Sequence, residues 1–289
     1  MRCSKIYAMT SKVIFVYGTL LKGLERNAAL TSSKYLGPAL IKARLFDLGS
    51  YPGIAEGNAD VVGEIYEVDE QTLNNLDAIE GYSESAPESS LYLRKPMVAR
   101  KLADGAGVDV ETYFYSSPNE KTIKGQDYRA FRLEKESKKE QWVIAYGSNI
   151  STERINDRLT GSNLPLAQDY IKGVLPEYEL VFNKKAGGND SVYANIRFEE
   201  GTQGCPAVAW KLTQEQVAVI DRCEGVNTGH YLKVGMSLKS DDGATRMAIC
   251  YIAHPDKIVE NGEVSESYLT LIRNGYDEMG WALMPKLKE

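Results

Sequence analysis

The sequence contains few of the residues that build metal centres and disulfide frameworks. It has two histidines and four cysteines, with no Cys-x-x-Cys pair and no histidine at metal-ligand spacing from a cysteine. Zinc sites need several such ligands at short spacing, so we expect no metal ion, and we expect no other cofactor. Scattered cysteines in a chain of 289 residues are typical of reduced thiols, which predicts a cytoplasmic protein. The four are Cys3, Cys205, Cys223 and Cys250.

Long apolar runs and an excess of positive charge are also missing. No segment approaches the roughly 20 apolar residues that a membrane-spanning helix needs, and the first ten residues lack a signal-peptide pattern. Lysine and arginine number 34 against 40 aspartates and glutamates, for a net charge of −6. This balance argues against a nucleic-acid partner, which would need a basic face. We therefore expect a small-molecule partner and no membrane, and the sequence does not indicate an oligomeric state.

What the sequence does contain is an internal duplication. A short apolar run, typical of a buried strand, is followed twice by Tyr-Gly and a hydroxyl residue, which predict a turn. Further along each half, an alternating strand pattern leads to a helix N-cap, a short amphipathic helix and a Glu-Gly pair. A strand beginning with Tyr-Leu and a basic residue follows each glutamate. The paired segments are 13–20 with 143–150, 63–81 with 207–225, and 92–97 with 231–236.

A charged run between the two halves marks the expected domain boundary. Residues 132–140 are rich in lysine and glutamate and lack the apolar periodicity of a core helix. Such a run is typical of a solvated linker or of the end of a solvated helix. We therefore predict one domain over residues 1–136 and a second over residues 137–289.

The ordered motifs resemble the γ-glutamyl cyclotransferase family. In the second half, Tyr-Gly-Ser-Asn precedes Glu224, and Tyr231 follows at the spacing of the γ-glutamyl cyclotransferases. In the first half, Tyr-Gly-Thr-Leu precedes Glu80, as in the γ-glutamylamine cyclotransferase and AIG2-like branch. The resemblance implies an α+β fold, with two tandem γ-glutamyl cyclotransferase-like mixed β-barrel domains and flanking helices. It places a cavity in each domain between the Tyr-Gly turn and the glutamate.

The same resemblance implies release of a γ-glutamyl group from an amine as 5-oxoproline. The α-amine attacks its own γ-carbonyl, so proximity supplies much of the rate and no covalent enzyme nucleophile is needed. Glu224 and Glu80 are the candidate general acid/base groups, best suited if burial raises the pKa of the carboxyl toward neutrality. Turn N–H groups would form an anion cradle, and tyrosines would wall the pocket or donate hydroxyls. The expected substrate-binding residues are Tyr146, Gly147, Ser148, Asn149 and Tyr231 in the second domain, and Tyr17, Gly18, Thr19, Leu20 and Tyr92 in the first.

The first half departs from the family pattern at one point, so the sequence does not decide which residues form its site. The loop between Glu80 and Tyr92 is longer than the family spacing, so Tyr92 reaches the site over this loop, Tyr82 replaces it, or the site is altered. On spacing alone we favour the second domain as the catalytic one. We interpret His230 as a structural or substrate-edge residue and Cys223 as a packing residue, because the first copy has neither.

Three functions fit these residues. The first is deprotection of an amine metabolite; a narrower resemblance to family members of antibiotic biosynthesis implies a γ-glutamyl-protected aminoglycoside side chain. The second is a γ-glutamyl amino acid or peptide cyclotransferase, which a basic side chain at the pocket mouth would favour; Lys184 and Lys185 are candidates for that position. The third is a non-catalytic module that binds an amine-bearing ligand.

Overall fold

The chain forms two compact units. The structure, a computed structural model, describes residues 11–118, 121–125, 127–137, 139–188, 191–284 and 287, so Cys3 lies outside the described part. One unit holds the residues up to Lys101 together with Ala106–Lys124, and the other holds Leu102–Gly105 together with the residues from Gly125 onward. The domain ranges 1–136 and 137–289 stay a prediction.

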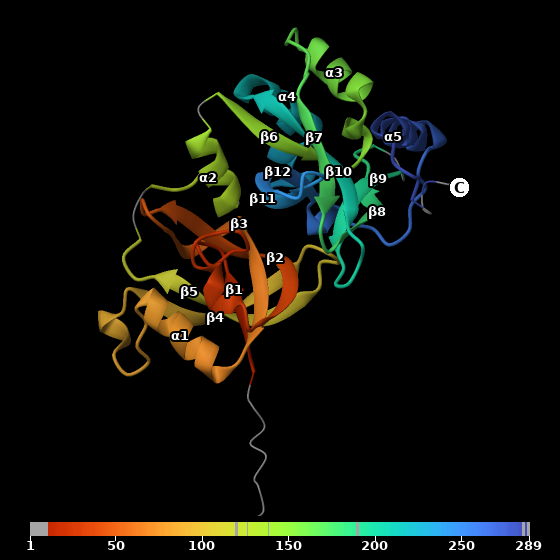
Figure 1. The fold of residues 1–289 in the computed structure, drawn as a ribbon. Helices are drawn as coiled ribbons and strands as arrows, with labels where there is room; N and C mark the ends of the chain where they lie inside the picture. The colour runs from red at the N-terminus through yellow and green to blue at the C-terminus, as the bar shows by residue number, and fades with distance from the viewer. Residues whose placement is uncertain are drawn as a thin grey trace, which may run out of the picture. The chain divides into compact units, whose positions relative to one another are not determined.

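The first unit is built around a closed five-stranded barrel (Figure 1). The strand order is β1-β3-β2-β4-β5, and β1 closes the ring by pairing antiparallel to β3 and parallel to β5. Runs of consecutive buried residues, at 14–16, 37–41 and 61–66, form much of the barrel core. The strands are β1 (Lys12–Val16), β2 (Lys34–Asp47), β3 (Pro52–Val68), β4 (Tyr92–Lys101) and β5 (Gly107–Tyr115).

The second unit repeats this barrel. Its strand order is β10-β6-β12-β11-β7, with β6 antiparallel to β10 and parallel to β12. Read around the ring, β6, β10, β7, β11 and β12 take the places of β1, β3, β2, β4 and β5. The shared cyclic order and the single parallel pair confirm the duplication and the mixed-barrel α+β fold. The strands are β6 (Glu140–Ala145), β7 (Tyr170–Leu175), β10 (Cys205–Thr213), β11 (Tyr231–Ser240) and β12 (Thr245–Ala253).

A short helix carries the glutamate motif in each unit. Helices α1 (Glu70–Glu80) and α4 (Gln214–Cys223) begin where the side chains of Asp69 and Thr213 accept hydrogen bonds from the first turn. Helix α1 stops at Gly81, whereas α4 has Glu224 as its C-cap and Gly225 directly after it; both glycines lie in the left-handed region, with φ of 62°. Since these caps fix where each helix ends, they also fix where each glutamate projects.

The second unit carries elements that the first lacks. Strands β8 (Tyr178–Lys185) and β9 (Val192–Phe198) form a hairpin, and helices α3 (Thr152–Thr160) and α5 (Glu266–Met279) flank the barrel. Helix α2 (Tyr128–Glu136) takes up part of the charged run, which is therefore the end of a helix rather than only a linker. No helix among the described residues is long and apolar enough to cross a membrane. Short 3₁₀ segments are Asn27–Leu30, Pro87–Ser89, Ser148–Ile150, Val226–Thr228 and Pro255–Lys257.

Candidate functional site

The first barrel holds a cavity of about 220 Å³ between the turn after β1 and the end of α1. All the site residues predicted for this domain line it: Tyr17, Gly18, Thr19, Leu20, Glu80 and Tyr92. The sequence analysis missed Arg26, Tyr51 and Tyr113, which also line the cavity. Tyr113 lies in the strand that closes the first copy, whereas Arg26 lies outside every repeated motif.

Glu80 is the acidic group of this cavity. It is partly buried, and its carboxylate accepts no hydrogen bond from the described residues. Burial raises the pKa of Glu80 to about 7, against an opposing effect of Arg26. A carboxyl with a pKa near neutrality can both accept and return a proton at physiological pH.

The hydroxyl groups of the cavity tyrosines donate hydrogen bonds to backbone carbonyl oxygens of the barrel. Tyr17 donates to the carbonyl oxygen of Tyr113 at 2.6 Å, and Tyr92 donates to that of Pro52 at 2.6 Å. These side chains therefore form the wall and leave only oxygen lone pairs for a ligand. Tyr92, which follows the long loop, lines the cavity. Tyr82 is not among the lining residues, and its ring lies 5.2 Å from the Arg94 guanidinium.

The turn after β1 offers backbone donors. Among the described residues, no acceptor binds the backbone N–H of Thr19 or Leu20, and both residues line the cavity. A Cβ at Gly18 would lie 2.8 Å from Cγ of Pro52, so only glycine lets the turn pack this closely. The arrangement suits a carboxylate or a developing oxyanion.

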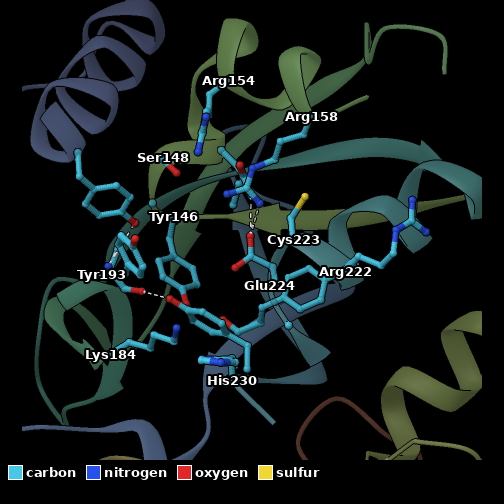
Figure 2. A pocket seen from close by; sticks show the side chains of 18 of the residues that line it. Tyr146, Ser148, Arg154, Arg158, Lys184, Tyr193, Arg222, Cys223, Glu224 and His230 are labelled. Carbon is cyan, nitrogen blue, oxygen red and sulfur yellow. Dashed lines mark hydrogen bonds and ion pairs between the residues drawn. The ribbon is translucent and has the colours of Figure 1, made fainter. Parts of the chain in front are cut away.

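The second barrel holds a larger cavity of about 470 Å³, shown in Figure 2. Every residue predicted for this site lines it: Tyr146, Gly147, Ser148, Asn149, Glu224 and Tyr231. The wall repeats that of the first barrel. Tyr146 donates to the carbonyl oxygen of Tyr251 at 2.5 Å, and Tyr231 donates to that of Ala194 at 2.7 Å.

Glu224 differs from Glu80 in its partners. Its Oε1 accepts 2.7 Å from Arg158 Nη1 and 3.1 Å from Asn149 Nδ2 (Figure 2). Both partners come from the segment after β6, and the indole of Trp210 donates to the carbonyl oxygen of Asn149 at 2.8 Å, which fixes this turn. The carboxylate of Glu224 is therefore held by two side chains, whereas that of Glu80 accepts no hydrogen bond from the described residues.

Basic side chains surround the second cavity. Arg154, Arg158, Lys184 and Arg222 line it, and among the described residues Glu224 is the single acidic one in the lining. Sequence reasoning missed the two arginines of α3, because they belong to an element without a counterpart in the first half. Of the two lysines that we expected at the pocket mouth, Lys184 lines this cavity. Lys185 is exposed and lines a different groove.

His230 and Cys223 also line the second cavity. Nδ1 of His230 is buried without a hydrogen-bond partner, and burial, followed by Lys184 and Lys257, lowers the pKa of the imidazole. Among the described residues, no group of three metal-ligating side chains comes together.

Each copy matches the profile of an AIG2-like family. The profile of the family described as "Gamma-glutamyl cyclotransferase, AIG2-like" matches residues 14–130, and the profile of the AIG2-like family matches residues 207–282. A relative from Methanocaldococcus jannaschii that bears the γ-glutamylcyclotransferase name is 31% identical over 123 residues, which are 41% of this chain and 97% of the relative. The γ-L-glutamyl-butirosin B γ-glutamyl cyclotransferase of Niallia circulans is 31% identical over 124 residues, covering 42% of this chain and 78% of that enzyme.

Coverage is lower for a third relative. A Vibrio cholerae protein that bears the γ-glutamylcyclotransferase name is 47% identical over 70 residues, so the match spans 24% of this chain and 61% of that relative. The tandem fold itself has a match in the crystal structure of YkqA from Bacillus subtilis. That structure aligns with a TM-score of 0.76 at 21% identity, over 96% of this chain and 95% of YkqA, and therefore supports the two-barrel fold.

Proposed function

The chain belongs to the γ-glutamyl cyclotransferase family, and from this we propose that its first domain releases γ-glutamyl groups from amines as 5-oxoproline, with Glu80 as the general acid/base. The observation that carries the proposal is the state of Glu80. Its carboxyl lies in a tyrosine-walled cavity without a hydrogen-bond partner among the described residues, and burial raises its pKa to about 7.

One carboxylate can serve every proton transfer of this reaction. Glu80 takes a proton from the substrate ammonium and passes it to solvent, and the freed α-amine attacks the γ-carbonyl to form the lactam C–N bond. Glu80 then takes the second proton from the attacking nitrogen and gives it to the leaving nitrogen as the bond between that nitrogen and the carbonyl carbon breaks. The N–H groups of Thr19 and Leu20 are placed to bind the α-carboxylate or the carbonyl oxygen as charge develops.

The charges of the first cavity favour an amine leaving group that has no carboxylate. Of the residues that the structure describes, Arg26 is the one cationic residue in the lining, and its charge acts on Glu80. One cation can pair with the α-carboxylate that every γ-glutamyl substrate carries, and this described lining provides no second cation for an anionic leaving group. We propose a γ-glutamyl-protected aminoglycoside side chain as the specific substrate, because the chain is similar to the γ-L-glutamyl-butirosin B γ-glutamyl cyclotransferase.

The test measures 5-oxoproline by mass spectrometry. The panel contains a γ-glutamylated aminoglycoside, γ-glutamylethylamide and γ-glutamylalanine, each given to the wild-type chain, Glu80→Gln and Glu224→Gln. We expect release from the first two compounds, with a loss of about 100-fold or more in Glu80→Gln. If no compound yields 5-oxoproline while the protein remains folded, the chain is an amine-binding module. If only Glu224→Gln abolishes release, the catalytic glutamate is the one in the second domain.

A further inference from the structure

Glu64 is a buried carboxylate of the first domain that the proposed reaction does not use. It lies on β3, is 2% exposed, and pairs in the strand register with Val16, the last residue of β1. Its Oε2 accepts a hydrogen bond of 2.9 Å from the backbone N–H of Lys22 and another of 2.9 Å from the hydroxyl of Tyr66. A carboxylate is costly to bury unless it is hydrogen-bonded, so these two contacts constrain the groups that donate them.

Tyr66 extends this contact to the turn after β1. Its hydroxyl, which donates to Glu64, accepts a hydrogen bond of 3.3 Å from Nδ2 of Asn27. The same nitrogen donates to the carbonyl oxygen of Leu20 at 2.7 Å. Glu64 therefore holds the turn and the loop that follows it at two points: directly at Lys22, and at Leu20 through two side chains.

The backbone hydrogen bonds of this loop set the directions of the N–H groups of Thr19 and Leu20. In a planar trans peptide group the C=O and N–H bonds point in opposite directions. The carbonyl oxygen of Gly18 accepts from the N–H of Leu21 at 3.0 Å, and that of Thr19 accepts from the N–H of Arg26 at 3.0 Å. The N–H groups of Thr19 and Leu20, which belong to these two peptide groups, are thus directed away from the loop. Because both residues line the cavity, a shift of the loop would turn the donors of the site.

The second barrel holds the equivalent carbonyl group with different residues. In the strand register, Val208 of β10 takes the place of Glu64. Two residues further on, Trp210 donates directly to the carbonyl oxygen of Asn149 at 2.8 Å. Asn149 corresponds to Leu20 in the repeated Tyr-Gly turn. Both barrels thus fix the same carbonyl group, the first through a carboxylate network and the second through one indole, which indicates that the position of this turn matters to the site.

We propose that Glu64 is a positioning residue of the first site, which holds the N–H groups of Thr19 and Leu20 in place to bind an anionic oxygen of the substrate. The inference rests on the proposed function and adds to it a group that touches no reacting atom. Glu64 acts through the backbone at Lys22 and through the hydroxyl of Tyr66. The donors of the turn are then oriented before the substrate binds, and they need no reorientation as charge develops on the carbonyl oxygen.

The test measures the binding of 5-oxoproline, the proposed product, to the full-length chain. This probe carries the α-carboxylate and the former γ-carbonyl oxygen, and its binding requires no turnover. The amide resonances of Thr19 and Leu20 in NMR spectra report on the first cavity alone. We expect both resonances to shift on titration of the wild type. The dissociation constant obtained from them should rise about 10-fold or more in Glu64→Met, which keeps the length of the side chain without its oxygens.

Three further variants identify the cause. Glu64→Gln keeps an oxygen that accepts from Lys22 and Tyr66, so its dissociation constant should stay within about 3-fold of the wild-type value. Tyr66→Phe should weaken binding in the same direction as Glu64→Met, and it carries the test if Glu64→Met fails to fold. Tyr82→Phe is the matched control and should bind like the wild type, because Tyr82 is not among the described residues of the cavity lining. Thermal unfolding of each variant checks that the first domain is folded.

The outcomes separate this inference from the proposed function. The inference is overturned if 5-oxoproline leaves the resonances of Thr19 and Leu20 unmoved in the wild type, or if folded Glu64→Met or Tyr66→Phe binds like the wild type. A loss in Glu64→Gln as large as that in Glu64→Met also overturns it. None of these results depends on 5-oxoproline release, which reports on Glu80. A chain that releases no 5-oxoproline but binds it in this Glu64-dependent way refutes the proposed catalysis and supports the positioning role.

Discussion

The hydroxyl of Tyr113 donates a 2.7 Å hydrogen bond to Asp77, one helical turn before Glu80 on α1. Arg94 approaches the other oxygen of the same carboxylate at 3.2 Å. The second domain repeats the arrangement, with Tyr251 at 2.6 Å and Lys233 at 2.9 Å from Asp221. In both domains an aspartate thus ties the end of the glutamate helix to two barrel strands. The position of the glutamate depends on this link.

Tyr113→Phe tests the link in the first domain. The substitution removes one hydrogen bond to a charged, partly buried group, so we expect a loss of about 1.5–3 kcal/mol in unfolding free energy. Because the end of α1 also loosens, kcat for the amine substrate should fall, while KM changes little. Chemical denaturation and steady-state kinetics measure the two effects. A variant with unchanged stability and kcat would show that the link does not position Glu80.

The pH dependence of the first site follows from Glu80. Its pKa of about 7 means that the base form is lost as the pH falls below neutrality. We expect the ionisation of Glu80 to make kcat/KM for γ-glutamylethylamide rise with pH and level off above about pH 7. A profile measured between pH 5 and 9, corrected for the ionisation of the substrate amine, checks this. A limb with a pKa near the ordinary value of about 4.3 would contradict the environment described for Glu80.

Stability should depend on the same ionisation. The folded pKa of Glu80 lies above its unfolded value, so between about 4.3 and 7 the folded state binds the proton more tightly, and stability falls as the pH rises through this window. Glu80→Gln removes the penalty. We expect this variant to match the wild type near pH 4 and to exceed it in Tm above pH 7, where the penalty is complete. An equal Tm difference at both pH values would exclude this cause.

The ion pair between Arg158 and Glu224 predicts that substitutions at these two residues have strongly non-additive effects on the free energy of unfolding. Arg158→Met leaves a largely buried carboxylate without its cation, which should cost roughly 3 kcal/mol of stability in the second domain. The double variant Arg158→Met/Glu224→Gln should recover most of that loss, because no charge remains unpaired. Denaturant unfolding of the four members of this cycle measures the coupling. Additive losses would mean that the two side chains act independently.

The repeated parts of the molecule could be predicted from the sequence, and the unrepeated parts could not. Glu80 is the last residue of a short amphipathic helix and Glu224 directly follows one, and the cap residues at both ends of each helix are local signals that are readable in one chain. The partners of these glutamates are not local. Arg158 reaches Glu224 from α3 and Lys184 reaches the cavity from the β8–β9 hairpin, both of which depend on long-range packing.

Motif spacing and the environment of the carboxyl favour different domains as the catalytic one, because the neighbours of each glutamate cannot be read from local sequence. The second copy keeps the family spacing between Glu224 and Tyr231, and this was the reason to favour it as the catalytic domain. The environment of each carboxyl depends on neighbours distant in the sequence. It leaves Glu80 unpartnered among the described residues and ties Glu224 to Arg158 and Asn149.

Ring closure has a consequence for the duplicated chain. A sheet that closes on itself has no unpaired outer strand, which removes the template on which open sheets add strands from other molecules. Two homologous barrels in one polypeptide would otherwise be prone to exchange strands and misassemble, a hazard of tandem repeats during folding. Because each barrel closes through its own parallel pair of strands, the two copies can diverge in sequence while each keeps its own ring.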